Sequence, residues 1–221
     1  FDFTIMHRFG KICLDDRVYK DFLGFDSPAN IRFSLSYKLN DRLYVGVGRT
    51  KIGKTIDFEG KYVLLRQTAD NSSPLSIAIF NNTGINTEPF NDYGPNAFFS
   101  DSITPFENKF SHRISYTTEL ILSRKFSDKL SLQLSPTIVY KNLVFGLEED
   151  HFTFVLPFSG RFQYSFGSAL LFEYAHKLNN RSESALDNPF SLGFEFGRFP
   201  LFFHEFGFDE PGLNQNQFNV F

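Results

Sequence analysis

Residues 48–55 match the nucleotide-binding loop pattern G-x-x-x-x-G-K-T in full, from Gly48 to Thr55. Such a loop holds phosphates because it follows a buried strand and opens a helix whose first amide groups face the anion. The residues that follow, 56–61, instead place apolar and charged side chains in alternation, as in another strand. We therefore expect no nucleotide binding at this segment.

The five histidines are the other residues with obvious chemistry: His7, His112, His151, His176 and His204. Metal binding would require several of them to converge on one ion at about 2.0–2.1 Å, whereas they fall in separate segments of the chain. No serine stands at a distinctive spacing from a histidine and an acid, as a hydrolase would need. The sequence thus predicts no metal, no cofactor and no catalytic residue, and it favours histidines that accompany aromatic residues at a membrane interface.

Charged residues recur on the polar register of the alternating segments. These are Arg32, Asp57, Glu59, Lys61, Arg113, Glu119, Lys129, Arg161, Glu173 and Glu195. Alternate side chains of a strand point to opposite faces, so these ten residues share one face and are predicted to line a lumen. A lining of one sign would indicate an ion-selective pore, and the mixed signs instead indicate charges that pair across a narrow interior.

The elements that must position these charges are clearest in residues 29–47. From Ala29 to Leu39 every odd position is apolar and every even position is polar, without interruption. A turn at Asn40-Asp41 is followed by the same apolar register in residues 43–47, which predicts a β-hairpin. Strands of globular proteins run about 5–6 residues, whereas a tilted membrane-spanning strand needs about 9–11. The hairpin therefore predicts transmembrane strands.

The composition agrees with a membrane barrel. Phenylalanine accounts for 31 of 221 residues, while the mean hydropathy is only -0.22 and no run approaches the roughly 18 apolar residues of a membrane helix. A membrane barrel has no such run, because half of the residues in each strand face the lumen and are polar. The net charge of -3 argues against a nucleic-acid partner, and the single Cys13 excludes an internal disulfide. No linker divides the chain, so residues 1–221 are expected to form one domain.

The fold class predicted is all-β, an antiparallel up-and-down transmembrane β-barrel of about 12 strands. The strands are expected near residues 1–9, 29–39, 43–47, 56–64, 75–79, 113–122, 130–140, 152–164, 170–177, 190–196, 202–208 and 218–221. From residue 54 on, even-numbered positions are expected to face outward. The hairpin also repeats, since residues 38–43 (KLNDRL) correspond to residues 125–130 (KFSDKL).

The connections predict the orientation. Those at 10–28, 81–108, 142–151, 179–188 and 209–217 are long, and those at 40–41, 127–128, 165–168 and Pro200 are short, with 51–53 and 67–74 as imperfect members. Outer-membrane barrels have long extracellular loops and short periplasmic turns, so both termini are expected in the periplasm. Because 218–221 is too short to cross a bilayer, the natural chain is expected to continue by at least about six residues.

Several motifs carry a resemblance to a known family. They are HRFG (7–10), FDSPANIR (25–32), DRL (41–43), KY and LLRQ (61–62 and 64–67) and RKFSDKLSLQLSP (124–136). In these the chain resembles a family of outer-membrane β-barrels from Bacteroidota that is catalogued as a domain of unknown function. The resemblance covers residues 7–145 well and implies a barrel fold and an outer-membrane address, without activity or site residues.

We therefore expect a non-enzymatic, integral protein of the bacterial outer membrane. Mixed lumen charge favours a scaffold or accessory subunit of an outer-membrane protein assembly, and the alternative is a passive porin-like channel or transporter for small solutes. The expected partners are outer-membrane lipid, lipopolysaccharide and other outer-membrane proteins, with no nucleic acid or nucleotide.

Overall fold

The computed structural model describes residues 1–8, 30–89, 98, 104–144, 150–179, 190–198 and 201–206. Its strands are β1 (Asp2–Arg8), β2 (Asn30–Lys38), β3 (Leu43–Thr50), β4 (Thr55–Leu65), β5 (Ser76–Asn86), β6 (Ile114–Lys125), β7 (Leu130–Leu134), β8 (Thr137–Lys141), β9 (Phe152–Ser165), β10 (Ser168–Lys177), β11 (Phe190–Arg198) and β12 (Leu201–Phe206). Short 3-10 turns, η2 (Ile52–Lys54) and η3 (Phe110–Arg113), precede β4 and β6. Each segment predicted before residue 209 contains a strand.

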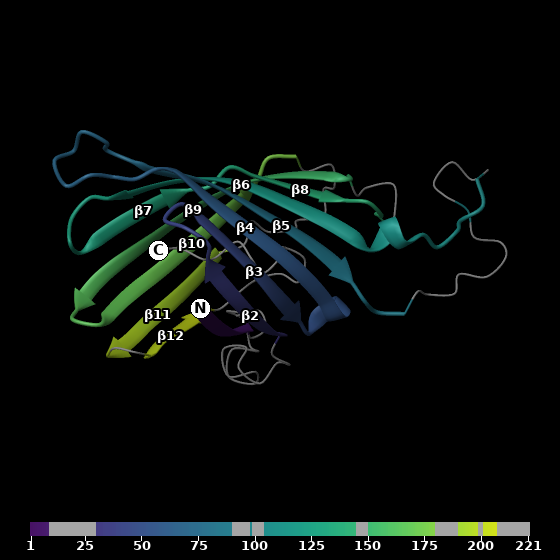
Figure 1. Cartoon of the computed structure of the whole chain (residues 1–221), viewed down its shortest axis with the longest axis horizontal. Coiled ribbons are helices and arrows are strands. Elements are labelled where there is room, and N and C mark those ends of the chain that lie inside the picture. Colours follow the sequence, from purple (N-terminus) through teal and green to yellow (C-terminus); the bar gives the residue numbers. More distant parts are fainter. Residues whose placement is uncertain are drawn as a thin grey trace, which may run out of the picture.

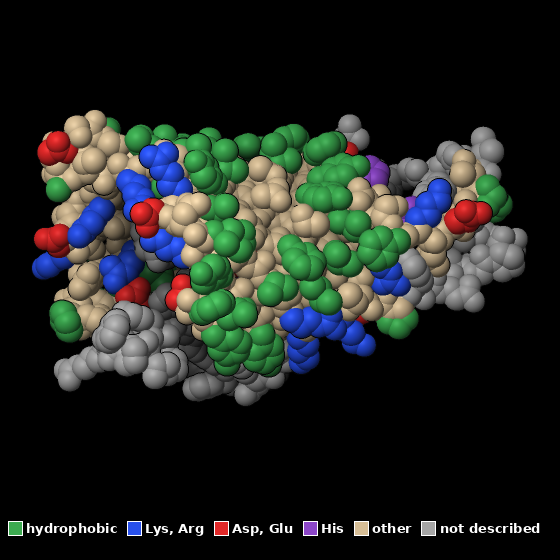
Figure 2. Space-filling model, in the orientation of Figure 1, with side chains coloured by type: hydrophobic (Ala, Val, Ile, Leu, Met, Phe, Trp, Pro, Cys, Tyr) green, Lys and Arg blue, Asp and Glu red, His purple; other side chains and the backbone are tan. Residues whose placement is uncertain are grey.

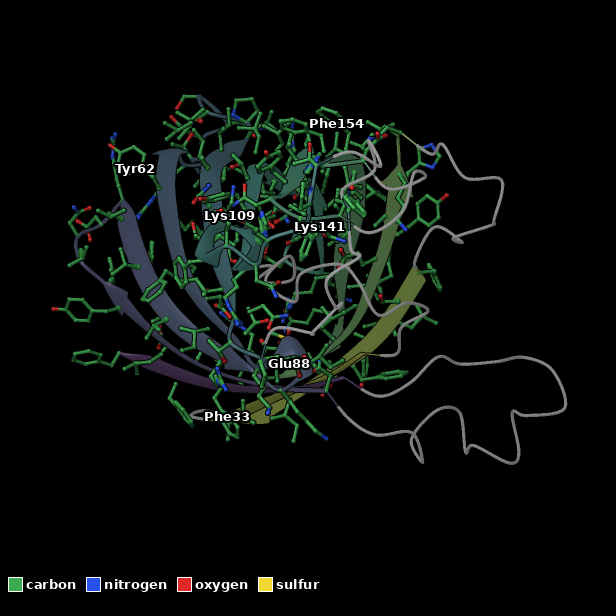
Figure 3. All side chains as sticks on the ribbon, turned by 90° about the vertical axis from the view of Figure 1, so that its right-hand side faces the viewer. Phe33, Tyr62, Glu88, Lys109, Lys141 and Phe154 are labelled. Atoms are coloured by element: carbon green, nitrogen blue, oxygen red, sulfur yellow. The ribbon has the colours of Figure 1, made fainter. Side chains whose placement is uncertain are left out.

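The strands form one antiparallel sheet in which neighbours in sequence are neighbours in space. The sheet is tilted and curled, so that β1 and β12, the edge strands of the part described, come close to each other (Figure 1). In Figure 3 the strands follow an arch around a central space. The sheet therefore has a convex outer face and a concave inner face.

The period of two places apolar side chains on the convex face. Phe33, Tyr62 and Phe154, from β2, β4 and β9, lie on the outside of the arch (Figure 3) and are 46%, 43% and 41% exposed. Most strands after residue 54 follow the predicted parity, with even positions outward. The prediction is wrong for β5, in which Ile79 is outward and Ala78 and Phe80 are buried. The reason is that the ten-residue connection 66–75 lets β5 begin with its odd-numbered residues facing outward.

The predicted strand 130–140 is divided into β7 and β8. Pro136 has no amide hydrogen to donate, so the ladder is interrupted there. The neighbouring groups still pair, because Ser135 N donates to Pro157 O at 2.9 Å and Leu120 N donates to Pro136 O at 3.0 Å. Both halves lie between β6 and β9, so they make a single crossing of the sheet.

The two hairpins predicted to be repeats share their turn geometry. Leu39 N donates to Leu43 O at 2.9 Å, and Phe126 N donates to Leu130 O at 2.9 Å. Each turn therefore holds three residues and not the two predicted. A side-chain oxygen at the start of each turn accepts backbone amides that the longer turn leaves without a partner in the ladder. The Asn40 oxygen accepts the amides of residues 42 and 43, and the Ser127 hydroxyl accepts those of residues 129 and 130.

An exposed ion pair closes each of these turns. Lys38 Nζ lies 2.8 Å from Asp41 Oδ1, and Lys125 Nζ lies 2.9 Å from Asp128 Oδ1. The hydrogen bond from each lysine lowers the pKa of the aspartate beside it. Since all four side chains are well exposed, the pairs shape the turns and contribute little to stability.

The connections divide between the two ends of the sheet as predicted. The strand ends joined by 39–42, 66–75, 126–129, 166–167 and 199–200 lie at one end of the sheet, the turn end. The strand ends joined by 9–29, 51–54, 87–113, 142–151 and 178–189 lie at the other, the loop end. In Figure 2 charged side chains gather at the turn end, on the left. The predicted strand at 218–221, with its expected continuation, and Cys13 lie outside the described residues.

Candidate functional site: a buried charge network

Eight of the ten charged residues predicted to line a lumen lie on the concave face. Arg32, Asp57, Glu59, Lys61, Glu119, Arg161, Glu173 and Glu195 are buried or half-buried. The other two lie at the ends of the sheet instead. Arg113 belongs to η3 at the loop end, where its guanidinium donates to the carbonyl oxygens of Asn86 and Glu88. Lys129 is exposed in the turn before β7, because the three-residue turn ends the alternation there.

Arg32 is the centre of the network. Its side chain is 1% exposed. Its Nε donates to Asp57 Oδ1 at 3.2 Å, one terminal nitrogen donates to Asp57 Oδ2 at 2.6 Å, and the same nitrogen donates to Glu59 Oε2 at 2.8 Å. The Ser36 hydroxyl donates to Glu59 Oε1 at 3.1 Å. A planar guanidinium held by two buried carboxylates is the strong, geometrically defined form of an ion pair.

Two glycines of β3 make room for this cluster. Arg32 lies on β2 and its acidic partners lie on β4, so the ion pair must pass over the strand between them. A Cβ at Gly48 would lie 2.5 Å from Asp57 Oδ2 and 2.6 Å from an Arg32 nitrogen, and one at Gly46 would lie 2.5 Å from Glu59 Oε1. The cluster therefore rests on bare backbone, a recognised use of glycine within a strand.

Arg161 and Glu195 form a second interior pair with the same design. Arg161 Nε donates to Glu195 Oε2 at 2.9 Å and a terminal nitrogen donates to Oε1 at 2.7 Å, which makes the pair bidentate. The two residues lie on β9 and β11, so the pair spans β10. Ala169 of β10, 0% exposed, is the small residue between these strands. Both bidentate pairs thus tie together strands that are not hydrogen-bonded to each other.

Lys61 and Glu119 are a looser third pair. Both are paired in register with Phe80 of β5, which lies between them and is 4% exposed. The Glu119 carboxylate is within the electrostatic reach of Lys61 and of the Ser135 hydroxyl. Glu173, 4% exposed, lies on β10. Among the described residues, the concave face thus carries three cations and five carboxylates.

Apolar side chains also fill the concave face, which the alternation did not predict. Ala78, Phe80 and Ile121 form a buried cluster against Val63, and Val139, Val155 and Leu171 are at most 8% exposed. Their burial shows that neighbouring side chains pack over these parts of the concave face and exclude water from them.

Sequence reasoning missed the polar and glycine residues that support the charges. Ser36, Asn82, Gly46 and Gly48 all touch the Arg32 cluster or give it space. A signal for the glycines is present, because Gly46-x-Gly48 has the strand period of two.

The segment that matches the nucleotide-binding loop forms a different structure. Residues 48–55 run from the end of β3 through η2 into β4, and the two strands are antiparallel. Gly53 and Lys54 reverse the chain with positive φ angles of 63° and 42°. No helix N-terminus follows to receive a phosphate, so the match to the pattern lacks its structural context.

The histidines with described side chains lie near aromatic rings at the loop end. His112 stacks on Phe106, His151 lies 5.9 Å from Tyr140, and His176 stacks on Tyr174. The side chains of His7 and His204 lie outside the described part. Within the described ranges no group of three His, Cys, Asp or Glu residues could hold a metal ion.

The comparisons with known proteins identify the architecture. No helix in the described residues is both long and apolar enough to cross a membrane. Comparison with curated proteins and with solved structures finds no match. A family model described as a membrane bound beta barrel domain (DUF5777) matches residues 1–219, a range that includes every strand of the curled sheet. The chain therefore belongs to this family of membrane-bound β-barrel domains.

Proposed function

We propose that this protein is an integral outer-membrane barrel with a closed interior, and that it acts as a non-enzymatic scaffold or accessory subunit of a membrane protein assembly. The observation that carries the proposal is the burial of the interior charges. Arg32 is 1% exposed and satisfied by two carboxylates, and packed apolar side chains occupy the same face. A conducting pore needs side chains that face water along its length.

The proposed orientation follows from the two ends of the sheet. Most connections at the turn end are short and most at the loop end are long. This is the arrangement of outer-membrane barrels, in which the turns are periplasmic. Because β1 begins at the turn end, this orientation would put the start of β1 on the periplasmic side. The loop end, with His112, His151 and His176 among aromatic rings, then faces the outside.

Planar-bilayer recording tests whether the interior is closed. We expect the pure protein to insert without producing reproducible conductance steps, because the buried charge pairs and apolar side chains of the inner face oppose the entry of water. Flotation of the same preparation with vesicles verifies insertion. Reproducible open steps would contradict the proposal and would instead support a passive channel for small solutes.

Native electrophoresis tests the scaffold role. Protein extracted from its own outer membrane should migrate as a larger particle than the pure, refolded protein in the same detergent, because the partner subunit is present only in the extract. Equal migration of the two samples would show that no other protein is bound and would overturn this part of the proposal.

A further inference from the structure

The convex face carries a polar patch halfway along three adjacent strands. The patch consists of Gly60 on β4, Asn81 and Thr83 on β5, and Thr118 on β6. Gly60 is paired in register with Asn81, and Asn81 with Thr118, so three of the four residues form one row. Asn81 and Thr118 are exposed.

Apolar residues surround this patch along each strand. On β4, Phe58 and Tyr62 flank the glycine; on β5, Ile79 and Ile85 flank the polar pair; on β6, Tyr116 and Leu120 flank the threonine. The patch is therefore inside the apolar band that contacts lipid and not at its border. In Figure 2 the hydrophobic side chains are interrupted by tan surface near the middle of the visible face.

A second outward-facing glycine, Gly160, differs from Gly60 in how closely neighbouring side chains cover it. Gly160 of β9 is covered by its neighbours, since a Cβ there would lie 2.4 Å from the Phe172 ring and 2.9 Å from Leu132. A Cβ at Gly60 would meet nothing within 4 Å. The chain thus fills one glycine gap with its own side chains and leaves the other open.

The polar patch is costly in contact with lipid tails. Asn81 Nδ2 donates to Thr118 Oγ1 at 2.9 Å. An amide has two hydrogens and one oxygen acceptor, so this bond leaves the Asn81 oxygen and one hydrogen without a hydrogen bond among the described residues. Acyl chains offer neither donor nor acceptor, and unsatisfied polar groups in hydrocarbon are strongly unfavourable.

We propose that this patch, formed by Gly60, Asn81, Thr83 and Thr118, is the interface at which two copies of the chain associate within the membrane. The patch is uncharged and carries both donors and acceptors, so it is complementary to itself. Two barrels inserted in the same direction are related by an axis along the membrane normal, which brings identical residues together at equal depth. Two Asn81 amides can then satisfy each other, and the bare backbone at Gly60 permits close approach.

Fluorescence energy transfer between labelled copies in lipid vesicles tests the interface. We expect transfer for the unaltered protein at low protein-to-lipid ratio and an association about tenfold weaker for Asn81→Leu, because two hydrogen bonds between the copies are lost. The control is Phe194→Leu, on the outward face of β11, which should leave the association unchanged. Equal association of all three proteins would place any dimer on another surface.

Disulfide trapping locates the contact independently. In a Cys13→Ser background, Ile79→Cys, which borders the patch, should cross-link two copies under mild oxidation, and Leu192→Cys on β11 should not. Equal cross-linking at both positions would show random collision and contradict the proposal. A pure protein that stays monomeric in both assays would also overturn it, including when extracts contain a larger particle, since the partner would then be a different protein.

This inference goes beyond the scaffold role and does not depend on it. A dimer of the pure protein can form whether or not the interior conducts. Failure of the energy-transfer test would leave the bilayer recording unaffected, and the reverse also holds.

Discussion

Replacing Arg32 with methionine is expected to destabilise the folded protein by about 3–5 kcal/mol. The guanidinium is the only cation bonded to Asp57 and Glu59 among the described residues, and both carboxylates are at most 7% exposed. Removing one partner of a buried pair leaves uncompensated charge, which costs far more than the pair contributes when intact. Urea unfolding in lipid vesicles, followed by heat-modifiable electrophoretic migration, measures the loss.

Two further variants make this prediction specific. Lys125→Met removes the cation of an exposed turn pair and should unfold like the unaltered protein. Adding Asp57→Asn and Glu59→Gln to Arg32→Met should recover much of the lost stability, because the buried negative charge is then removed as well. A triple variant as unstable as the single one would show that packing around Arg32, and not charge, carries the effect.

Replacing Gly48 with alanine is the second large effect expected, a loss of about 1–3 kcal/mol. The new Cβ would overlap Asp57 Oδ2 and the Arg32 guanidinium, and neither can retreat without lengthening the ion pair that joins them. Gly60→Ala is the matched control, since a Cβ there meets nothing within 4 Å.

The control should be neutral or slightly more stable, because alanine loses less backbone entropy than glycine in a strand. Both glycines lack a positive φ angle, so backbone strain does not enter the comparison. Unfolding of both variants is compared in an Asn81→Leu background, in which the proposed association of copies is already weakened. Equal loss at both positions would mean that any glycine-to-alanine change weakens the sheet, and the cluster would then not depend on bare backbone.

The strands and their faces were predictable because alternation with a period of two directly reports which side chains share a face. Phe33 and Leu35 are outward and Arg32 and Ser34 are buried, as the pattern indicated. The outward face changes from even-numbered to odd-numbered positions in β5. A ten-residue connection such as the one before β5 does not determine which residues of the next strand face outward.

The details of the interior were less predictable. The alternation places Arg32, Asp57 and Glu59 on one face, but their meeting across β3 depends on two glycines whose role appears only when the strands are paired. Arg113 and Lys129 follow the polar register in sequence, yet they lie beyond the regular sheet at its two ends. A pattern along one strand does not report where the sheet stops.

Thiol labelling along β5 tests most directly whether the barrel has a lipid-facing outside and a closed inside. In a Cys13→Ser background, cysteine at position 77 or 79 should react with a lipid-soluble maleimide and not with a water-soluble one. Cysteine at Ala78 or Asn82 should react with neither reagent until the protein is unfolded, because both side chains are at most 5% exposed. Rapid reaction of the inward cysteines with the water-soluble reagent in the folded protein would reveal a water-filled lumen and contradict this account.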